Sequence, residues 1–384
     1  MSWDVIVVGA GAMGSAVAYE LSRRGQRVLV LEQFAVGHGR GSSHGLTRII
    51  RLAYFEHPSY VPLLHRAFER WRDLEHASGR TLLHVTGSID AGPVDSRTVQ
   101  GSLHSCDVHG LPHEVLTSAE LSARCPGYVL PPEYLAVLQP DGGFLIPEAC
   151  ITAHVELATA AGADVKPNEK VVSVEPTPSG GVVVHTASQR FEAGQAVIAA
   201  GAWLGVLVPA LGALVRAERQ VLAWFAVADG DAFAPSRFPV FNLDHDGEHW
   251  YGFPEFGVPG FKLGCYHHLR ERVDPDALDR DAVRPRDLEL LRRGVARCFP
   301  AANGDVLMTK TCLFTNTPYE HFILDRHPDM PQVVIASPCS GHGFKFASVV
   351  GEIVADLVQH NATAHDISLH RLTRFSAIDR PGGP

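Results

Sequence analysis

The chain has 384 residues, of which 46% are hydrophobic and 20% are charged, and its formal net charge is −9. This length exceeds the roughly 250–300 residues at which single cores stop growing, so it predicts two domains or one large one. The composition is that of a globular enzyme, and the acidic balance argues against nucleic acid or an anionic membrane as the main partner.

We expect no membrane span, no signal peptide and no disulfides. No apolar run approaches about 18 residues, and the first residues lack the basic and small-residue pattern of a secretion signal. Seven cysteines are scattered without a CxxC pair, which predicts reduced thiols in a cytoplasmic protein and no structural zinc. The 21 histidines are dispersed as well, so no metal site is expected.

The first informative segment is "DVIVVGAGAMGSAVAYELSRRGQRVLVLEQ". Residues 4–8 form an apolar run, after which Gly9, Gly11 and Gly14 match G-x-G-x-x-G, and the second apolar run ends at Glu32. A strand, turn, helix and strand with a final acidic residue is the dinucleotide-binding fingerprint. The helix N-terminus would face a pyrophosphate, and Glu32 would bind a ribose and disfavour a 2′-phosphate. The motif alone does not choose between NAD and FAD.

Two later segments favour FAD. Residues 191–203, "FEAGQAVIAAGAW", predict a strand that runs into a glycine turn. Residues 331–359 predict a strand, a glycine-rich loop and an amphipathic helix. Pieces of the nucleotide domain therefore return late in the chain. An NAD-binding domain is usually continuous, whereas flavoproteins often build their domain from separated segments.

The intervening stretches are rich in proline, aromatic residues and short alternating runs such as "GEHWYGFPEF" and "FKLGCYHHL", which predict strands of a second sheet. We therefore predict an α/β fold with a Rossmann-like FAD-binding domain built from separated segments, plus a sheet-based α+β substrate domain. The FAD-binding domain is expected to comprise residues 1–82, 146–217 and 313–384. The substrate domain is expected to comprise residues 83–145 and 218–312.

Five motifs in the same order resemble the family of monomeric sarcosine oxidase, N-methyltryptophan oxidase and pipecolate oxidase, the amine-oxidising branch of the D-amino-acid-oxidase-like flavoproteins. The motifs are "DVIVVGAGAMG", "GSSHGLTRIIRLAY", "YGFPEFG" with "FKLG", "CLFTNT" with "HFILD", and "SGHGFKF". The likeness covers nearly the whole chain. It implies FAD as cofactor, a small amino acid and O2 as reactants, and a protein expected to be a monomer.

Cys312 lies among threonines in "TKTCLFTNT". The resemblance implies that its sulfur is bonded to the 8α carbon of the FAD ring. An isolated thiol needs no disulfide partner if a cofactor is its partner. The alternative is that Cys312 fills the core, as free cysteines often do.

The segment "SSHGLTRIIRLAY" places His44, Arg48 and Arg51 within eight residues. Arg48 and Arg51 are three residues apart, so in a helical turn both could face one way. Arginine can donate two parallel hydrogen bonds to a carboxylate. By resemblance, Arg51 and Lys345 hold the substrate carboxylate, while His44 and Arg48 lie beside the flavin ring. The alternatives are a solvated basic face and an exposed loop lysine.

Three further roles are implied by the resemblance. Lys262 lies over the flavin and activates O2, Tyr251 lines the substrate pocket, and the histidine that follows the lysine is catalytic. His267 matches that histidine better than His268, given the downstream "VDPD". The run is one residue longer than the family pattern, and a β-bulge could absorb the extra residue. From the residues alone, Lys262 is better interpreted as an outward-pointing strand lysine, and Tyr251 as either a pocket or a core aromatic.

Two departures from the family concern specificity. Phe314 stands where the sarcosine enzyme has a pocket tyrosine, and Cys339 stands where the family commonly has phenylalanine. The lost hydroxyl and the smaller side chain allow a bulkier N-methyl or cyclic amino acid. The positions expected to contact FAD are Gly9, Gly11, Met13, Gly14, Glu32, Gln33, Ser42, His44, Thr47, Arg48, Val171, Gly201, Trp203, Cys312, Gly341, Gly343, Phe344 and Lys345.

We predict an FAD-dependent amine oxidase that converts a secondary amino acid to an imine and releases H2O2; sarcosine would give glycine and formaldehyde. The alternatives on the same scaffold are oxidation of N-methyltryptophan, pipecolate, proline or another bulkier amino acid, deaminating amino-acid oxidation, and a dehydrogenase with another electron acceptor. An NAD-dependent dehydrogenase and a flavin-binding sensor are rivals from other classes.

Overall fold

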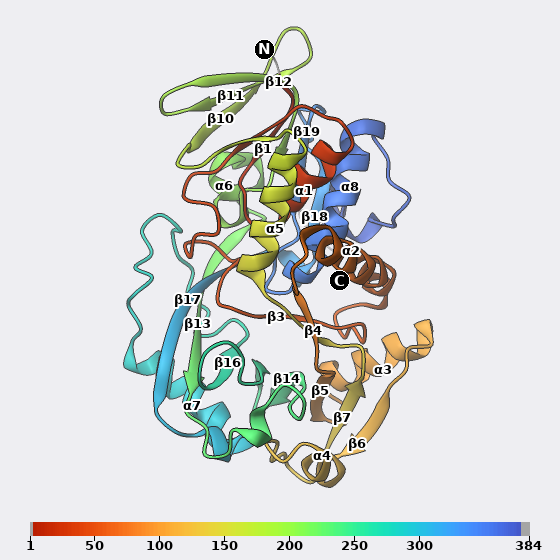
Figure 1. The fold of residues 1–384 in the computed structure, drawn as a ribbon, viewed down its shortest axis with the longest axis vertical. Helices are drawn as coiled ribbons and strands as arrows, with labels where there is room; N and C mark the ends of the chain where they lie inside the picture. The colour runs from red at the N-terminus through yellow and green to blue at the C-terminus, as the bar shows by residue number, and fades with distance from the viewer. Residues whose placement is uncertain (1–2, 378–384) are drawn as a thin grey trace.

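The computed structural model describes residues 3–377, and two eight-stranded sheets dominate it, one above the other in Figure 1. The upper sheet runs in the order β10 (Val171–Pro176), β11 (Val182–Thr186), β12 (Arg190–Ile198), β1 (Trp3–Val8), β2 (Val28–Leu31) and β9 (Asp164–Lys166), with β19 (Val333–Ser337) beside β12 and β18 (Ile323–Arg326) beside β19. Strands β9, β2, β1, β12 and β19 are mutually parallel.

The lower sheet runs in the order β17 (Val306–Asn316), β13 (Arg216–Phe225), β16 (Phe261–Cys265), β15 (Glu248–Phe253), β14 (Val240–His245), β5 (Ser88–Pro93), β7 (Tyr134–Gln139) and β6 (Glu114–Thr117). A small third sheet joins β3 (Arg48–Ile50), β8 (Gly143–Leu145) and β4 (Leu83–Val85). The α-helices are α1 (Ala12–Arg23), α2 (Val61–Ser78), α3 (Arg97–His109), α4 (Ser118–Arg124), α5 (Pro147–Ala160), α6 (Leu204–Leu207), α7 (Pro285–Cys298) and α8 (Ala347–His360).

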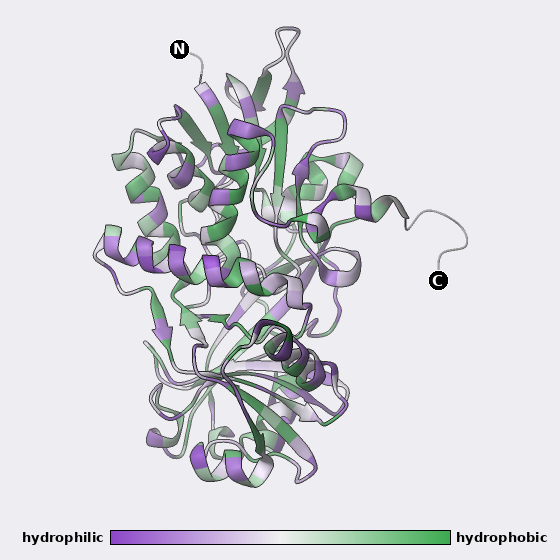
Figure 2. Ribbon diagram, turned by 90° about the vertical axis from the view of Figure 1, so that its right-hand side faces the viewer, coloured by the Kyte–Doolittle hydropathy of each residue, from purple (hydrophilic) through white to green (hydrophobic). Residues whose placement is uncertain are grey.

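Both faces of the upper sheet are buried, which explains its uninterrupted apolar strands. Val5 and Val7 belong to the core under helices α1, α2, α5 and α8, whereas Ile6 and Val8 belong to a second core with β11 and α6. In Figure 2 the strands of this upper sheet are mainly green and the helices beside them alternate purple and green. This pattern is expected for a buried sheet under amphipathic helices.

The lower sheet has two chemically different faces. Phe261 and Leu263 of β16 pack in the core under α7. Lys262 points to the opposite face, where its Nζ lies 4.1 Å from the ring centre of Phe253 and 5.3 Å from that of Trp224. Alternation along the strand therefore sends one face to a hydrophobic core and leaves the other for polar chemistry.

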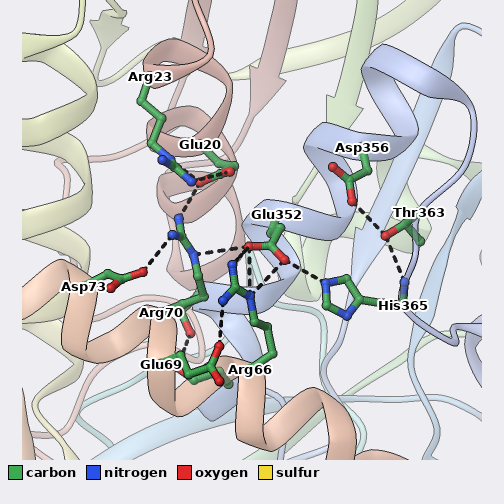
Figure 3. A network of polar contacts seen from close by, with 12 residues as sticks. Glu20, Arg23, Arg66, Glu69, Arg70, Asp73, Glu352, Asp356, Thr363 and His365 are labelled. Atoms are coloured by element: carbon green, nitrogen blue, oxygen red, sulfur yellow. Dashed lines mark hydrogen bonds and ion pairs between the residues drawn. The ribbon is translucent and has the colours of Figure 1, made fainter.

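A charged network fastens the helices over the upper sheet (Figure 3). Glu20 of α1 is almost fully buried and pairs with Arg23 at 2.5 Å and with Arg70 of α2 at 2.6 Å. Glu352 of α8 pairs with Arg66 of α2 at 2.7 Å. Because each carboxylate is shared between helices, the network fixes how α1, α2 and α8 pack.

The predicted elements of both sheets are confirmed. The strand, turn, helix and strand of the fingerprint are β1, α1 and β2, the predicted strand and helix of residues 331–359 are β19 and α8, and the two alternating runs are β15 and β16. The proposed division into two domains stays a prediction; β4 and β8 belong to the small third sheet, apart from both large ones. Within residues 3–377, no helix combines the length and apolar character that crossing a bilayer requires.

Candidate active site

A cavity of about 350 Å³ extends between the two large sheets, and both the nucleotide-binding motif and the lower sheet line it. Its volume lies in the range of small-molecule sites. Most of the residues predicted to form the site line this cavity: Gly9, Gly11, Met13, Glu32, Gln33, Ser42, Arg48, Arg51, Val171, Gly201, Trp203, Tyr251, Cys312, Phe314, Gly341, Gly343, Phe344 and Lys345. Segments more than 300 residues apart in the chain therefore converge on one space.

The glycine turn builds one end of the cavity. Gly9 has a φ of 97°, and a Cβ there would lie 2.6 Å from the carbonyl oxygen of Ala199. A Cβ at Gly14 would lie 1.8 Å from the carbonyl oxygen of Gly9, so α1 packs directly on the turn. A Cβ at Gly11 would meet only the Ser43 hydroxyl, at 3.7 Å, and Gly11 supplies no side-chain cap to α1. The helix N-terminus is thus accessible to an anion such as a pyrophosphate.

Glu32 lies at the end of β2 and lines the cavity, although it is only 3% exposed. Its Oε2 accepts a hydrogen bond from the Ala10 N–H at 2.7 Å, and its Oε1 accepts one from the Phe34 N–H at 2.9 Å. A carboxylate offers about four acceptor sites, so Glu32 has capacity left for ribose hydroxyls. The turn and Glu32 together fit the adenosine diphosphate part of FAD.

Cys312 stands on β17 at the other end of the cavity and is almost fully buried. The Nη2 of Arg48 lies 3.5 Å from the Cys312 sulfur and donates to the Ser42 carbonyl at 2.8 Å. The Ser42 hydroxyl is buried and has no hydrogen-bond partner among the described residues. A thiol beside a guanidinium, next to an unsatisfied hydroxyl, fits the polar edge of a ring cofactor.

The polar face of the lower sheet forms one wall. Strands β13, β14, β15 and β17 present to it the side chains of Leu222, Asn242, Tyr251, Phe253, Cys312 and Phe314. Gly264 permits this arrangement, because a Cβ there would lie 2.4 Å from the ring of Tyr251. The Asn242 side chain is fixed by its hydrogen bond to Asp90 at 2.7 Å.

Arg51 lines the cavity from a fully buried position and already carries a counter-ion. Its Nη2 pairs with Glu56 at 2.7 Å, and its Nη1 lies 3.8 Å from Asp90. Burial disfavours ionisation of Glu56, but Arg51 outweighs it and lowers the pKa of that carboxyl to about 2. A substrate carboxylate would therefore share the guanidinium with Glu56.

Lys345 lines the same part of the cavity. Its Nζ donates to the His342 carbonyl at 2.7 Å and lies 3.5 Å from the Tyr54 hydroxyl. Burial and the neighbouring Arg51 lower the pKa of Lys345 to about 7. Arg51 and Lys345 both lie against the ring of Tyr54, with Cζ 4.4 Å and Nζ 5.2 Å from its centre, so the two cations are neighbours.

Lys262 is buried behind the cavity lining. Its ammonium donates to the carbonyls of Gly45 and Thr47 at 2.7 and 2.9 Å and to the Thr47 hydroxyl at 2.8 Å. Burial and the nearby Arg48 lower its pKa, while the three acceptors favour the charged form. The interpretation of Lys262 as an outward-pointing strand lysine is wrong.

Five predicted residues do not line the cavity: Gly14, His44, Thr47, Lys262 and His267. His44 lies behind its wall, where burial and Arg48 lower its pKa to about 3, so its imidazole is neutral. His267 points to Glu218 and Glu320 instead, and His268 is buried against Asp287.

The helical turn considered for Arg48 and Arg51 is wrong. Residues Arg48–Ile50 form strand β3, which pairs with β8. Two adjacent isoleucines favour the extended form. Both arginines nevertheless reach the cavity. The β-bulge that could have absorbed the extra residue is absent from β16, because its pairing with β15 runs without a register shift.

The sequence reasoning missed several lining residues, among them Ser43, Asn242, Tyr266 and His342. Strand alternation from Lys262 would have pointed to Tyr266. The others depend on how distant segments meet, for which a single sequence carries no signal. Within residues 3–377, no group of three or more His, Cys, Asp or Glu side chains has the geometry to hold a metal ion.

Comparisons with known proteins agree with this geometry. The sequence model of the family described as FAD dependent oxidoreductase matches residues 4–357. A monomeric sarcosine oxidase of Streptomyces avermitilis is 42% identical over 98% of this chain and 98% of that protein. An N-methyl-L-tryptophan oxidase of Yersinia pestis is 34% identical over 98% of this chain and 100% of that protein.

A solved structure is similar over nearly the whole fold. NikD in its open form, described as an unusual amino acid oxidase essential for nikkomycin biosynthesis, matches with a TM-score of 0.83 and 29% identity. The match covers 96% of this chain and 97% of that chain.

Proposed function

Because the chain belongs to the FAD dependent oxidoreductase family, we propose that it oxidises small N-methyl amino acids, with sarcosine as the type substrate and O2 as electron acceptor. The names of its relatives support this proposal, since sarcosine oxidase and N-methyl-L-tryptophan oxidase both act on secondary amines bearing a carboxylate. The two buried cations in the cavity match such a carboxylate.

When bound, FAD supplies a two-electron acceptor that O2 can reoxidise. Gly11 and the N-terminus of α1 would hold its pyrophosphate, Glu32 its ribose, and the turn of residues 341–345 the ring end of the cavity. The Cys312 sulfur would carry a thioether to the 8α carbon of the ring. Forming that C–S bond removes two electrons and two protons from the thiol and the ring methyl group, and O2 is the oxidant.

Arg51 and Lys345 would anchor the substrate through its carboxylate. Arg51 offers a planar fork for two parallel hydrogen bonds, and Lys345 adds a second positive charge that also lies against the ring of Tyr54. The aromatic side chains of Tyr251 and Phe314 would enclose the apolar remainder of the substrate. Because the cations hold the carboxylate and the aromatic side chains hold the apolar part, the C–H bond next to nitrogen would take a fixed orientation.

The overall reaction balances without an acid–base triad or a metal. The CH–NH unit loses two electrons and two protons to become an imine, O2 gains both to become H2O2, and water hydrolyses the imine. For sarcosine this gives glycine and formaldehyde. The buried ammonium of Lys262 would lower the energy of negative charge that develops on O2, because it is fixed in place before the reaction.

One observation carries the proposal: a single cavity is lined by the dinucleotide motif, by Cys312, and by the neighbouring cations Arg51 and Lys345. An NAD-binding domain alone would not require the last three.

The direct test is turnover with sarcosine under air. We expect H2O2, formaldehyde and glycine in equal amounts. Flavin-containing protein that produces none of them from sarcosine or any other N-methyl amino acid would refute the proposal. Product formed with an artificial acceptor but not with O2 would instead identify a dehydrogenase.

Three further expectations, on domains, oligomeric state and location, accompany this proposal. The chain divides into the FAD-binding and substrate domains given above, it acts as a monomer, and it works in the cytoplasm. The word "monomeric" in the name of the Streptomyces relative supports the second. Sedimentation at micromolar concentration tests it, and a mass of twice the 41.6 kDa chain would contradict it.

A further inference from the structure

The strand that carries Lys262 brings an unpredicted side chain into the cavity. Strand β16 pairs with β15 in unbroken register, so Lys262 and Gly264 share the polar face of the sheet. Tyr266 continues this alternation and lines the cavity. Directly after it the backbone turns sharply, because His267 and His268 both have positive φ values, of 56° and 32°.

Tyr266 completes an aromatic wall. Its ring centre lies 5.3 Å from that of Phe314 and 5.4 Å from that of Tyr251. Its hydroxyl donates to the carbonyl of Gly341 at 3.3 Å. A Cβ at Gly341 would lie 2.6 Å from the Phe314 ring, so Tyr266, the turn of residues 341–345 and Phe314 form one closed surface. Burial raises the pKa of Tyr266, which keeps its hydroxyl protonated as a donor.

His267 points out of the cavity and lies between two carboxylates, an arrangement called the ionic clamp below. One ring nitrogen lies 3.1 Å from Glu218 of β13, and the other lies 2.6 Å from Glu320. Hydrogen bonds to Glu218 and then Glu320 raise the pKa of His267 to about 9. The imidazolium thus ties the residue after Tyr266 to two separate segments. Glu320 itself has a φ of 60°, so the clamp also holds a strained turn.

We propose that Tyr266 is the specificity-determining residue of the substrate pocket and that His267 is a positioning residue that holds it there. The ring of Tyr266 sets the upper size of the substrate and favours small aliphatic N-methyl amino acids over those with aromatic side chains. A larger side chain would have to break the Tyr266–Gly341 hydrogen bond and displace the ring from Phe314. This inference rests on the proposed function and names its substrate class.

The test compares sarcosine with N-methyl-L-phenylalanine in the FAD-loaded enzyme. For Tyr266→Ala we expect the ratio of kcat/KM for the bulky over the small substrate to rise by at least about tenfold, because the vacated volume admits a ring. Tyr266→Phe keeps the ring and should leave the ratio within about threefold. Tyr19→Ala is the matched control, because this half-buried tyrosine on α1 lies outside the cavity lining.

The clamp is tested with His267→Gln. A positioning role predicts a higher KM for sarcosine with kcat within about twofold, and a ratio shifted in the same direction as in Tyr266→Ala. A histidine that acted on the substrate itself would instead lower kcat by about 100-fold or more, which would overturn the assignment. An unchanged KM and ratio would overturn it as well.

The outcomes separate this inference from the proposed function. If the wild type oxidises sarcosine and Tyr266→Ala keeps the wild-type ratio, the inference alone fails. If the wild type oxidises neither substrate, the proposed function fails first. Flavin absorbance and the thermal midpoint check folding, and Tyr266→Leu replaces the alanine variant if that variant does not fold.

Discussion

The guanidinium of Arg48 lies 3.5 Å from the sulfur of Cys312, inside the cavity that the dinucleotide motif also lines. The same guanidinium donates to the Ser42 carbonyl at 2.8 Å, so it is held in place beside the sulfur. The contact gives Cys312 a chemical environment that a core-filling cysteine does not need. It leads to the first prediction.

Replacing Cys312 by alanine should abolish covalent flavin attachment. After acid precipitation the wild type should give a yellow pellet, whereas Cys312→Ala should release its flavin to the supernatant. Cys339→Ala is the matched control, because Cys339 also lines the cavity but lies just before the turn of residues 341–345 and not on β17. A colourless wild-type pellet would show that no thioether forms.

The carboxylate anchor should respond to removal of either cation. Arg51→Gln and Lys345→Met each remove a charged donor, and such hydrogen bonds contribute about 1.5–3 kcal/mol. We expect KM for sarcosine to rise by about 10- to 100-fold in each variant. Steady-state kinetics measure this, and a change in kcat alone would place the carboxylate elsewhere.

The affinity of the cavity for a substrate carboxylate should also depend on pH. The lowered pKa of Lys345, about 7, means that its positive charge is present below that pH and is lost above it. The dissociation constant of methoxyacetate, which has no titrating amine, should therefore rise above about pH 7 in the FAD-loaded enzyme. Titration by flavin absorbance follows this, and the curve for Lys345→Met should be flat.

Lys262 should affect the reaction with O2 more than the reaction with the amine. In Lys262→Met we expect anaerobic reduction of the enzyme by sarcosine to persist while reoxidation by air slows on the order of 100-fold. Stopped-flow absorbance separates the two half-reactions. Equal slowing of both would assign Lys262 a general structural role through its bonds to the loop of residues 45–47.

The helix network of Figure 3 predicts acid sensitivity. Burial opposes ionisation of Glu352, yet Arg66 and His365 lower its pKa to about 2 in the folded chain. The contribution of Glu352 to the free energy of unfolding is therefore complete above its unfolded pKa of about 4.5, and it is lost as the pH falls toward 2. Glu352→Gln should lower the free energy of unfolding at pH 7 by about 1–3 kcal/mol. In this variant the free energy of unfolding should also fall less steeply at acid pH. A denaturant series at several pH values measures both.

Sequence patterns predicted the parts of the molecule that local chemistry controls. The glycine turn, Glu32 and the strands around Lys262 follow from spacing and alternation, so they were predicted from residues alone or by resemblance. The cavity lining around Asn242 and His342 was not, because it depends on contacts between segments distant in the chain. The turn after Cys265 shows the same limit: residue counting favoured His267 for the pocket, whereas unbroken strand register brings Tyr266 there.

The central claim is that an N-methyl amino acid, held by Arg51 and Lys345, delivers its electrons directly to the cofactor of this chain. Anaerobic titration of the FAD-loaded enzyme with sarcosine tests it most directly, with absorbance recorded across the flavin bands. We predict that they bleach completely with one equivalent of sarcosine, and that admitted air restores them with one equivalent of H2O2. Flavin bands that stay unchanged with sarcosine and with every other N-methyl amino acid would contradict the account.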